Sequence, residues 1–332
     1  MDGNSSQSAT PPDSGRWGSA DRISPGVSVP TDLAPDPPRS PRPFAAVRSH
    51  LESELEAASE LLCCLDFDGT LAPIVDRPDQ ARITPENDRA LRTLSSTESV
   101  TTAIVSGRSL ADVAPRVDGP SIYAGNHGLE LRTNGTETVH PIARTRSELV
   151  DEACGLLETV VDPIPNCRVE NKRLTGTIHL RGVPESCRAI VAARVRKVVE
   201  RFGDGALEVS QGKEIIEFSP AIPWGKGNAV ELIEEAYTED AFVIYLGDDR
   251  TDESGFRAAE SGFRATESGI RATESGIVRT RNRALPNEGP TKGVGIYVGD
   301  EPDEGHPSHA SVRVSSPEEV ATVLEWIASC VG

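Results

Sequence analysis

Two aspartates that follow an apolar run are the first residues in the chain with clear chemical potential. Asp66 and Asp68 lie two positions apart in the segment LLCCLDFDGT, which begins at residue 61. In an extended backbone both side chains project from one face, and Gly69 allows a sharp turn directly after them. Two carboxylates on one face repel each other unless a cation lies between them or one of them holds a proton. A solvated aspartate turn at a strand end explains the pattern equally well when it is taken alone.

Three more aspartates, Asp248, Asp249 and Asp252, follow the apolar run in AFVIYLGDDRTDE. If both runs are neighbouring strands, all five carboxylates lie at one edge of a sheet, and such a cluster requires a hard cation. Oxygen ligands without a nearby His or Cys favour Mg²⁺ over zinc. Because a Mg²⁺ ion held by a few carboxylates usually acts on phosphate, we predict phosphate chemistry at this edge.

Phosphate also needs hydroxyl donors and positive charge. Ser106, Gly107 and Arg108 end a third apolar run, SVTTAIVSGR, and offer a hydroxyl, close backbone approach and a guanidinium. Lys226 in PWGKGN precedes a predicted helix, where its ammonium and the helix N-terminus can both face an anion, although a solvated surface lysine is the alternative. A carboxylate can form an aspartyl-phosphate, and a second carboxylate can protonate the leaving alkoxide and then activate water. Neither a P-loop nor a G-x-G-x-x-G motif is present, which disfavours a nucleotide kinase or a dehydrogenase.

The elements that must position these residues form an alternating pattern. The three apolar runs are typical of strands buried on both faces, and helical patterns at 87–94 and 227–237 lie between them. This alternation predicts an α/β fold with a doubly wound parallel sheet. Ligands bind beyond the carboxyl ends of strands in such sheets, where all three runs carry their polar residues.

A segment of different texture, residues 130–221, interrupts this pattern. Its order of helix, two strands, helix and two strands predicts an inserted α+β cap domain over the strand ends. The first helix of this segment is expected in a stretch that contains Leu149, Leu156 and Val160. We therefore expect the core to comprise residues 44–129 and 222–332, with the cap as its substrate-specificity domain.

Two further segments fall outside the sheet pattern. Residues 1–43 hold nine of the 25 prolines and few large apolar residues, which predicts a disordered tail. Residues 253–280 repeat a heptad, ESGFRAA, ESGFRAT, ESGIRAT and ESGIVRT. A glycine in every repeat disfavours a partner-binding coiled coil and favours a tandem duplication that lengthens a surface helix or loop. Near the end, a capping box at Ser316 predicts a final helix up to Ser329.

The amino-acid composition indicates which binding partners and which cellular compartment to expect. The chain has 34 basic and 52 acidic residues, so its net charge of −18 disfavours nucleic acid and anionic membranes as partners. Its acid-rich, lysine-poor balance suits a high-salt cytoplasm. No apolar stretch is long enough for a membrane helix, and no signal-peptide pattern is present, so we expect a cytoplasmic protein. We also take a monomer as the expected state, although no sequence feature bears on it. The six cysteines form no C-x-x-C pair and are expected to be small buried residues.

The segments DFDGT, IVSGR, WGKG and GDDRTDE, in this order at predicted strand ends, resemble the four motifs of the haloacid-dehalogenase-like phosphatases. With the cap between the second and third motifs, and with AGNHGLE, VENKRLTGTIHLR and GKEIIEF, the chain resembles the trehalose-6-phosphate phosphatase family. The resemblance covers residues 61–252 and, less tightly, 293–330. It implies Mg²⁺-dependent hydrolysis of trehalose 6-phosphate, the last step of trehalose biosynthesis, through an aspartyl-phosphate.

The resemblance also implies roles for single residues. Asp66 would be the nucleophile and Asp68 the general acid and base, while Ser106 and Lys226 would hold the phosphate. Asp66, Asp248 and the backbone oxygen of Asp68 would bind Mg²⁺, with Asp249 and Asp252 supporting them. The residues expected to contact the phosphorylated disaccharide, besides Ser106, are Gly107, Arg108, Asn126, His127, Glu170, Lys172, His179, Arg181, Lys213 and Glu217.

Two other functions stay open at this point. A related capped phosphatase acting on another sugar phosphate or a glycosyl-glycerate phosphate would use the same core. A non-catalytic regulatory module that binds a sugar phosphate could dispense with the nucleophile, yet Asp66 and Asp68 are both present. The chain departs from the family in its proline-rich tail and in the heptad insertion, which starts directly after Asp252 and would disturb the following helix.

Overall fold

The computed structural model describes residues 40–212, 214–261, 269–273, 276–280, 293–300 and 308–332. Most of the predicted tail, Lys213 and part of the heptad repeat lie outside these residues. In chain order the elements are β1 Arg42–Pro43, α1 Phe44–Ala57, β2 Leu61–Leu65, η1 Pro78–Gln80, α2 Pro85–Ser95, β3 Val100–Val105, α3 Leu110–Val113, η2 Ala114–Arg116, β4 Ile122–Gly125, η3 Asn126–Gly128, β5 Glu130–Thr133, β6 Thr136–Val139, α4 Pro141–Thr145, α5 Ser147–Val161, β7 Arg168–Asn171, β8 Gly176–His179, α6 Glu185–Gly203, β9 Leu207–Gly212, β10 Ile215–Pro220, α7 Lys226–Tyr237, β11 Phe242–Gly247, α8 Glu253–Ser261, β12 Gly269–Thr273, β13 Gly276–Thr280, β14 Gly293–Val298, β15 Val312–Val314 and α9 Pro317–Val331.

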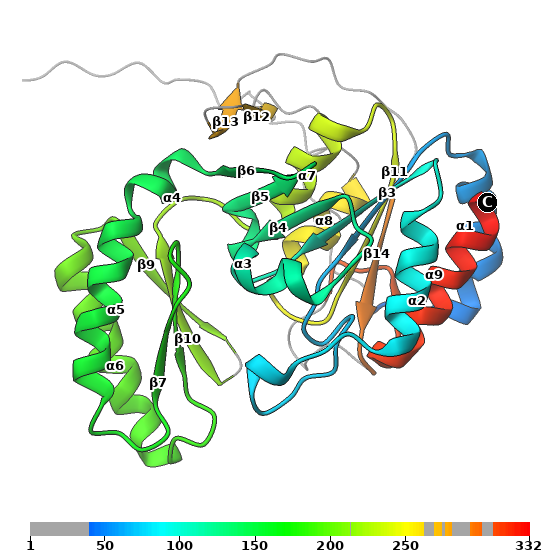
Figure 1. The fold of residues 1–332 in the computed structure, drawn as a ribbon. Helices are drawn as coiled ribbons and strands as arrows, with labels where there is room; N and C mark the ends of the chain where they lie inside the picture. The colour runs from blue at the N-terminus through cyan, green and yellow to red at the C-terminus, as the bar shows by residue number, and fades with distance from the viewer. Residues whose placement is uncertain (1–39, 213, 262–268, 274–275, 281–292, 301–307) are drawn as a thin grey trace, which may run out of the picture. The chain divides into compact units, whose positions relative to one another are not determined.

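The main sheet has nine strands in the order β1-β15-β14-β11-β2-β3-β4-β5-β6 (Figure 1). Neighbouring strands from β1 to β4 run parallel, and β5 and β6 add antiparallel strands at one edge. The three apolar runs of the sequence form the adjacent strands β11, β2 and β3. The predicted α/β fold with a parallel sheet is therefore confirmed.

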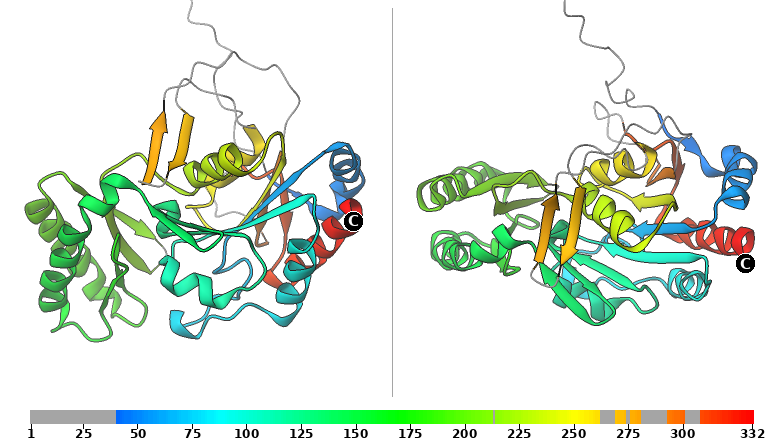
Figure 2. Two further views of the ribbon diagram at one scale, coloured as in Figure 1. Left: turned by 45° about the horizontal axis from the view of Figure 1, so that its top comes forward. Right: turned by 90° about the horizontal axis from the view of Figure 1, so that it is seen from above.

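Helices cover both faces of the main sheet, as an alternating strand and helix pattern requires. All five residues of β2 are buried, and they alternate between two apolar clusters. One cluster contains buried residues of α1, α2 and α9, and the other contains those of α7 and α8. Figure 2 shows these helices from two further directions. This packing on both faces explains why the strands appear in the sequence as continuous apolar runs.

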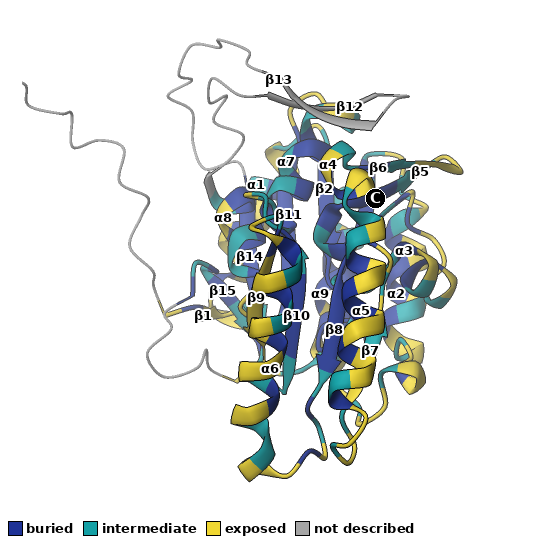
Figure 3. Cartoon of the chain, turned by 90° about the vertical axis from the view of Figure 1, so that its left-hand side faces the viewer, coloured by how far each residue is buried: buried dark blue, intermediate teal, exposed yellow. Residues whose placement is uncertain are grey.

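The inserted segment forms its own antiparallel sheet in the order β7-β8-β10-β9. Helices α5 and α6 pack on it around a separate apolar cluster and carry exposed residues on their outer side (Figure 3). The predicted helix is present as α5, in which Ala153 and Leu157 are buried and Leu156 is 45% exposed.

The predicted boundaries of the tail and of the cap also differ from the structure. Arg42 and Pro43, placed in the tail, pair with β15. Residues 130–139, placed in the cap, form the hairpin β5–β6 of the main sheet. Its turn holds Asn134 and Gly135 at φ of 49° and 77°, the left-handed geometry that Asn-Gly favours in two-residue hairpins. This Asn-Gly signal marks the hairpin in the sequence and was overlooked.

Several local predictions can be compared with the described residues. The first heptad forms α8, whereas β12 and β13 pair antiparallel, so the described part of the repeat is not one long helix. Ser316 precedes α9 but makes no side-chain cap bond, and Glu319 instead accepts a hydrogen bond from the backbone N–H of Ser315. All six cysteines are free, three buried and three half-buried. Among the described residues, none of the helices is both long and apolar enough to cross a membrane.

Candidate active site

The carboxyl ends of three neighbouring strands bring the candidate catalytic groups together. Asp66 follows β2, Ser106 follows β3 and Asp248 follows β11, and these strands are adjacent in the main sheet. Lys226 is the first residue of α7 and is 2% exposed. Its ammonium lies 3.1 Å from Oδ1 of Asp66. The edge at which the sequence placed the chemistry is thus the edge at which the side chains meet.

Asp252 is fully buried and holds this arrangement together. Its Oδ1 accepts hydrogen bonds from the Tyr245 hydroxyl at 2.6 Å and the Lys226 ammonium at 2.7 Å. Its Oδ2 accepts from the backbone N–H groups of Asp248 and Asp249, at 3.1 and 3.0 Å. An ionised carboxylate offers about four lone-pair positions, and all of them are used here. Asp252 therefore fixes Lys226 and the turn at Asp248 and has no lone pair left for a metal.

Tyr245 is a part of the site that sequence reasoning missed. It is fully buried in β11, and its ring meets that of Phe256 edge to face at 5.5 Å. Burial, with the neighbouring Asp252 and Asp66, raises the pKa of Tyr245 well above its ordinary value. The hydroxyl is therefore a neutral donor throughout the physiological range. A polar-tipped residue in an otherwise apolar strand was the only signal in the sequence.

The acidic groups at this edge fit a divalent cation. One carboxylate oxygen from each of Asp66, Asp248 and Asp252 lies within 4.8 Å of the others. Burial raises the pKa of Asp66 well above its ordinary value, with Lys226 opposing and the neighbouring aspartates adding to the rise. Burial and the charge of Asp66 raise the pKa of Asp248 in the same way. Because Asp252 is saturated, Asp66 and Asp248 are the side chains that can hold the cation.

Gly69 is required for this geometry. Its φ is +77°, and a Cβ at this position would lie 2.0 Å from Oδ2 of Asp248. The backbone after Asp68 therefore passes so close to the Asp248 carboxylate that only glycine fits. The glycine of the DFDG segment thus serves the approach of the two acidic segments as well as the turn.

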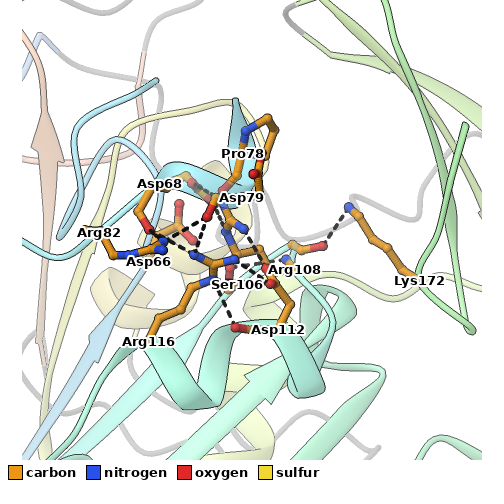
Figure 4. A network of polar contacts seen from close by, with 12 residues as sticks. Asp66, Asp68, Pro78, Asp79, Arg82, Ser106, Arg108, Asp112, Arg116 and Lys172 are labelled. Atoms are coloured by element: carbon orange, nitrogen blue, oxygen red, sulfur yellow. Dashed lines mark hydrogen bonds and ion pairs between the residues drawn. The ribbon is translucent and has the colours of Figure 1, made fainter. Parts of the chain in front are cut away.

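Arg108 and Asp68 form a bidentate ion pair beside the site (Figure 4). Nε and Nη2 of Arg108 lie 2.6 and 2.7 Å from the two carboxylate oxygens of Asp68. The guanidinium also donates to Asp112 at 2.5 Å and to the carbonyl of Pro78 at 2.9 Å. Arg116 holds the second oxygen of Asp112. The sequence assigned Arg108 to the substrate, but here its donors are directed to Asp68 and to this network.

The backbone carbonyls of residues 106–108 each accept a hydrogen bond, and these three bonds hold the loop in place. His127 N–H donates to the carbonyl of Ser106 at 2.9 Å, Lys172 Nζ to that of Gly107 at 2.9 Å, and Asn126 N–H to that of Arg108 at 2.6 Å. Ser106 is 1% exposed, and its Oγ accepts a hydrogen bond from the Arg108 N–H at 3.2 Å. Its hydroxyl proton is therefore not used in that bond and can be donated to an oxyanion.

Residues of the inserted segment reach the same loop. Glu217 accepts Lys172 Nζ at 3.2 Å on one oxygen and lies 3.1 Å from His127 Nε2 with the other. Burial would raise the pKa of Glu217, but the charges of Lys172 and His127 outweigh it and hold the pKa well below its ordinary value. A second pair joins Glu170 and His179 at 2.7 Å. These five residues, all predicted to face the sugar, include three that form one charged cluster beside Gly107.

Two other predicted sugar-binding residues do not join this cluster. Asn126 is fully buried, and its amide is used within the protein. Arg181 donates to Glu214 at 2.8 Å and to the carbonyl of Val75 at 2.6 Å instead. Lys213 lies outside the described residues. The directions that the side chains of Asn126 and Arg181 take were not visible in the sequence.

The fold is shared with several solved structures. A haloacid dehalogenase-like hydrolase from Bacteroides thetaiotaomicron aligns with a TM-score of 0.51 at 15% identity, covering 80% of this chain and 98% of that chain. The C-terminal domain of trehalose-6-phosphate phosphatase from C. albicans aligns with a TM-score of 0.68 at 21% identity, covering 88% and 99%. The fold is that of the haloacid-dehalogenase-like hydrolases.

The sequence places the chain more narrowly. The trehalose-phosphatase family model matches residues 64–286, and the chain belongs to this family. A probable trehalose-phosphate phosphatase H from Arabidopsis thaliana is 30% identical over 288 residues, which cover 82% of this chain and 72% of the relative. Other relatives from rice and Mycobacterium leprae are 37% and 39% identical, and the matched regions span 58% and 46% of their length. The expected family resemblance is confirmed.

Proposed function

We propose that the chain hydrolyses trehalose 6-phosphate to trehalose and phosphate, with Mg²⁺ as its metal ion. The observation that carries this proposal is the meeting of Asp66, Lys226, Ser106 and Asp248 at one edge of the main sheet, in a chain of the trehalose-phosphatase family. A buried carboxylate next to a buried ammonium supplies both a nucleophile and a counter-charge for phosphate oxygens. An intact Asp66 and Asp68 disfavour a purely regulatory module.

Each side chain of the site has its own role in the proposed reaction. A carboxylate oxygen of Asp66 attacks phosphorus, the bond to the sugar oxygen breaks, and Asp68 gives its proton to the leaving alkoxide. Asp68 then takes a proton from water, which attacks the aspartyl-phosphate and releases phosphate with Asp66 restored. Lys226 and the Ser106 hydroxyl stabilise the phosphate oxygens. A Mg²⁺ ion held by Asp66, Asp248 and the backbone oxygen of Asp68 would neutralise further phosphate charge.

Asp68 needs to change partners during this cycle. The bidentate contact with Arg108 occupies both carboxylate oxygens of Asp68, and a general acid must direct one of them to the leaving alkoxide. Asp68 therefore leaves Arg108 before it protonates the alkoxide. Arg108 thus serves as the resting partner of the general acid.

The sugar would be recognised by the charged cluster of Lys172, Glu217 and His127. These groups lie directly beside Gly107, which adjoins the proposed phosphate donor Ser106. A separate cavity of about 260 Å³ is lined by Arg108 from the main domain and by Arg168 and Glu170 from the inserted segment. Hydroxyl groups of a disaccharide match the carboxylate and ammonium partners that such a site offers.

The decisive experiment is phosphate release by the purified protein. Trehalose 6-phosphate, sucrose 6-phosphate and glucose 6-phosphate are compared with Mg²⁺ or with chelator, at low and high salt. We expect preference for the trehalose ester and loss of turnover with chelator. Preference for another ester would support a phosphatase but contradict trehalose 6-phosphate as its substrate. Turnover in the presence of chelator would contradict the dependence on Mg²⁺. An Asp66→Asn variant serves as the inactive control.

Other features of the chain stay predictions. They are the role of the inserted segment as a substrate-specificity domain, the cytoplasmic location, the monomeric state and the high-salt habitat. Light scattering of the purified chain tests the monomer directly. Activity that rises with salt would support the habitat, because screening relieves the repulsion within an acid-rich surface.

A further inference from the structure

The turn between β7 and β8 presents Lys172 to the 106–108 loop. Within the turn, Lys172 N–H donates to the carbonyl of Thr175 at 2.9 Å, and Leu174 N–H donates to the carbonyl of Lys172 at 2.9 Å. Leu174 is 1% exposed and packs in an apolar cluster with Leu129 and Val139 of the main domain. The backbone of the turn is thus closed on itself, and its apolar tip is anchored in the main domain.

A buried polar bridge links this turn to the main sheet. The Asn126 amide group donates to the carbonyl of Lys172 at 3.2 Å and to Oε1 of Glu130 at 2.7 Å. Its carbonyl oxygen accepts the Thr175 hydroxyl at 2.8 Å. Asn126 and Thr175 are both fully buried. Every polar atom of this amide therefore has a protein partner, so the bridge fixes one position of the turn.

Glu130 fixes the far end of the bridge. The same Oε1 that receives Asn126 accepts Leu110 N–H at 2.6 Å, and Oε2 lies 3.5 Å from the Arg173 guanidinium. Glu130 is 5% exposed and belongs to β5 of the main sheet. The bridge consequently runs from the start of α3, through Glu130 and Asn126, to both ends of the Lys172 turn.

We propose that Asn126 and Thr175 are positioning residues that set the place of Lys172 and thereby the preference for a phosphorylated disaccharide over simple phosphate esters. The proposal rests on the proposed function, because it assigns Lys172 to the sugar. Lys172 Nζ reaches both Gly107 O and Glu217 Oε1, so a shift of its turn moves the ammonium relative to both partners. Within the part of the chain that the structure describes, Asp66 and Lys226 form no hydrogen bond or ion pair with the bridge. The Asn126 backbone N–H does bind the carbonyl of Arg108, and a change at Thr175 leaves that N–H in place.

The test compares two substrates in matched variants of the full chain. Thr175→Val removes the hydroxyl at constant shape, whereas Thr175→Ser keeps the hydroxyl and removes the methyl group. Thr102→Val is the control, because Thr102 in β3 is also buried and its hydroxyl forms a 2.8 Å hydrogen bond with Oγ of Ser95, the last residue of α2. Steady-state kinetics are measured with trehalose 6-phosphate and with p-nitrophenyl phosphate, an ester without a sugar.

We expect Thr175→Val to raise KM for trehalose 6-phosphate by roughly fivefold, the usual effect of one lost hydrogen bond. Its kcat/KM for p-nitrophenyl phosphate should stay at the wild-type value, and Thr175→Ser should restore the preference for the sugar ester. Thr102→Val should leave the ratio of the two substrates unchanged. If Thr175→Val does not fold, Thr175→Ala takes its place with the same expectation.

A parallel loss on both substrates would overturn the proposal, because it would indicate a general structural role. The proposal would also be overturned if Thr175→Val left the ratio of the kcat/KM values for the two substrates unchanged. The same holds if Thr175→Ser gave the same kinetics as Thr175→Val. Failure of the proposed function would give a different result. It would appear in the wild type as preference for another sugar ester, and the same variants would then be compared on that ester.

Discussion

Replacing Tyr245 by phenylalanine isolates the contribution of one hydroxyl to the buried charge cluster. The ring keeps its edge-to-face contact with Phe256, so only the 2.6 Å hydrogen bond to Asp252 is lost. A hydrogen bond to a charged group contributes roughly 1.5–3 kcal/mol. For a domain of more than about 150 residues, each kcal/mol shifts Tm by about 2–4 °C. We therefore expect Tyr245→Phe to lower Tm by roughly 3–12 °C.

Tyr123→Phe is the matched control for this measurement. The Tyr123 hydroxyl donates at 2.8 Å to the backbone carbonyl of Val117, which is neutral, and the site is half-buried. Such a bond contributes only about 0.5–1.5 kcal/mol. Urea denaturation of both variants, with equal m-values, gives the two losses directly. A loss in Tyr245→Phe no greater than in Tyr123→Phe would refute the idea that this hydroxyl supports Asp252.

Three further predictions test the site. Gly69→Ala should weaken Mg²⁺ binding measured by calorimetry and abolish turnover, whereas Gly135→Ala, with the same φ of +77° but open space around its Cβ, should affect stability alone. Asp66→Asn should lower kcat by at least about 10³-fold with an unchanged circular dichroism spectrum, and residual turnover near wild type would exclude Asp66 as nucleophile. Because the folded protein depresses the pKa of Glu217, its ion pairs stabilise the fold above the ordinary value of 4.5 and this contribution is lost as pH falls below it. The stability difference between wild type and Glu217→Gln should therefore shrink from pH 7 to pH 3 in urea titrations, and a constant difference would contradict this pairing.

The main sheet and its reactive edge were predictable because they follow from burial and chain direction. A strand buried on both faces must be apolar throughout, as β2 is, and parallel strands must bring their carboxyl ends to the same edge. Asp66, Ser106 and Asp248 could thus be placed together from the sequence. The direction of the strands alone determines that these residues lie at one edge of the sheet, whatever the orientation of their side chains.

The contacts that hold the site could not be predicted in the same way. The Tyr245 hydroxyl reaches Asp252 only because the chain turns back after β11, and the sequence does not show this turn's geometry. Asn126 was expected to face the sugar, yet its left-handed backbone, at φ of 47°, accompanies an amide directed into the protein. Arg108 was matched to phosphate by its charge, but Asp68 and Asp112 compete for it more closely. Which of several charged partners a side chain contacts depends on distances in the folded protein, and the sequence does not give these distances.

The inserted segment leaves the main domain after β6 and returns before α7. All groups assigned to phosphate chemistry come from the main domain, so two junctions near residues 140 and 222 would suffice to build chimeras that exchange the segment between relatives. The contacts of Lys172 with Gly107 and Asn126 set a condition on such exchanges. A transplanted segment would function only in a host whose loop and buried amide receive the incoming lysine turn. If the inserted segment selects the substrate, as proposed, substrate range can diversify by recombination, but only among partners that share this docking point.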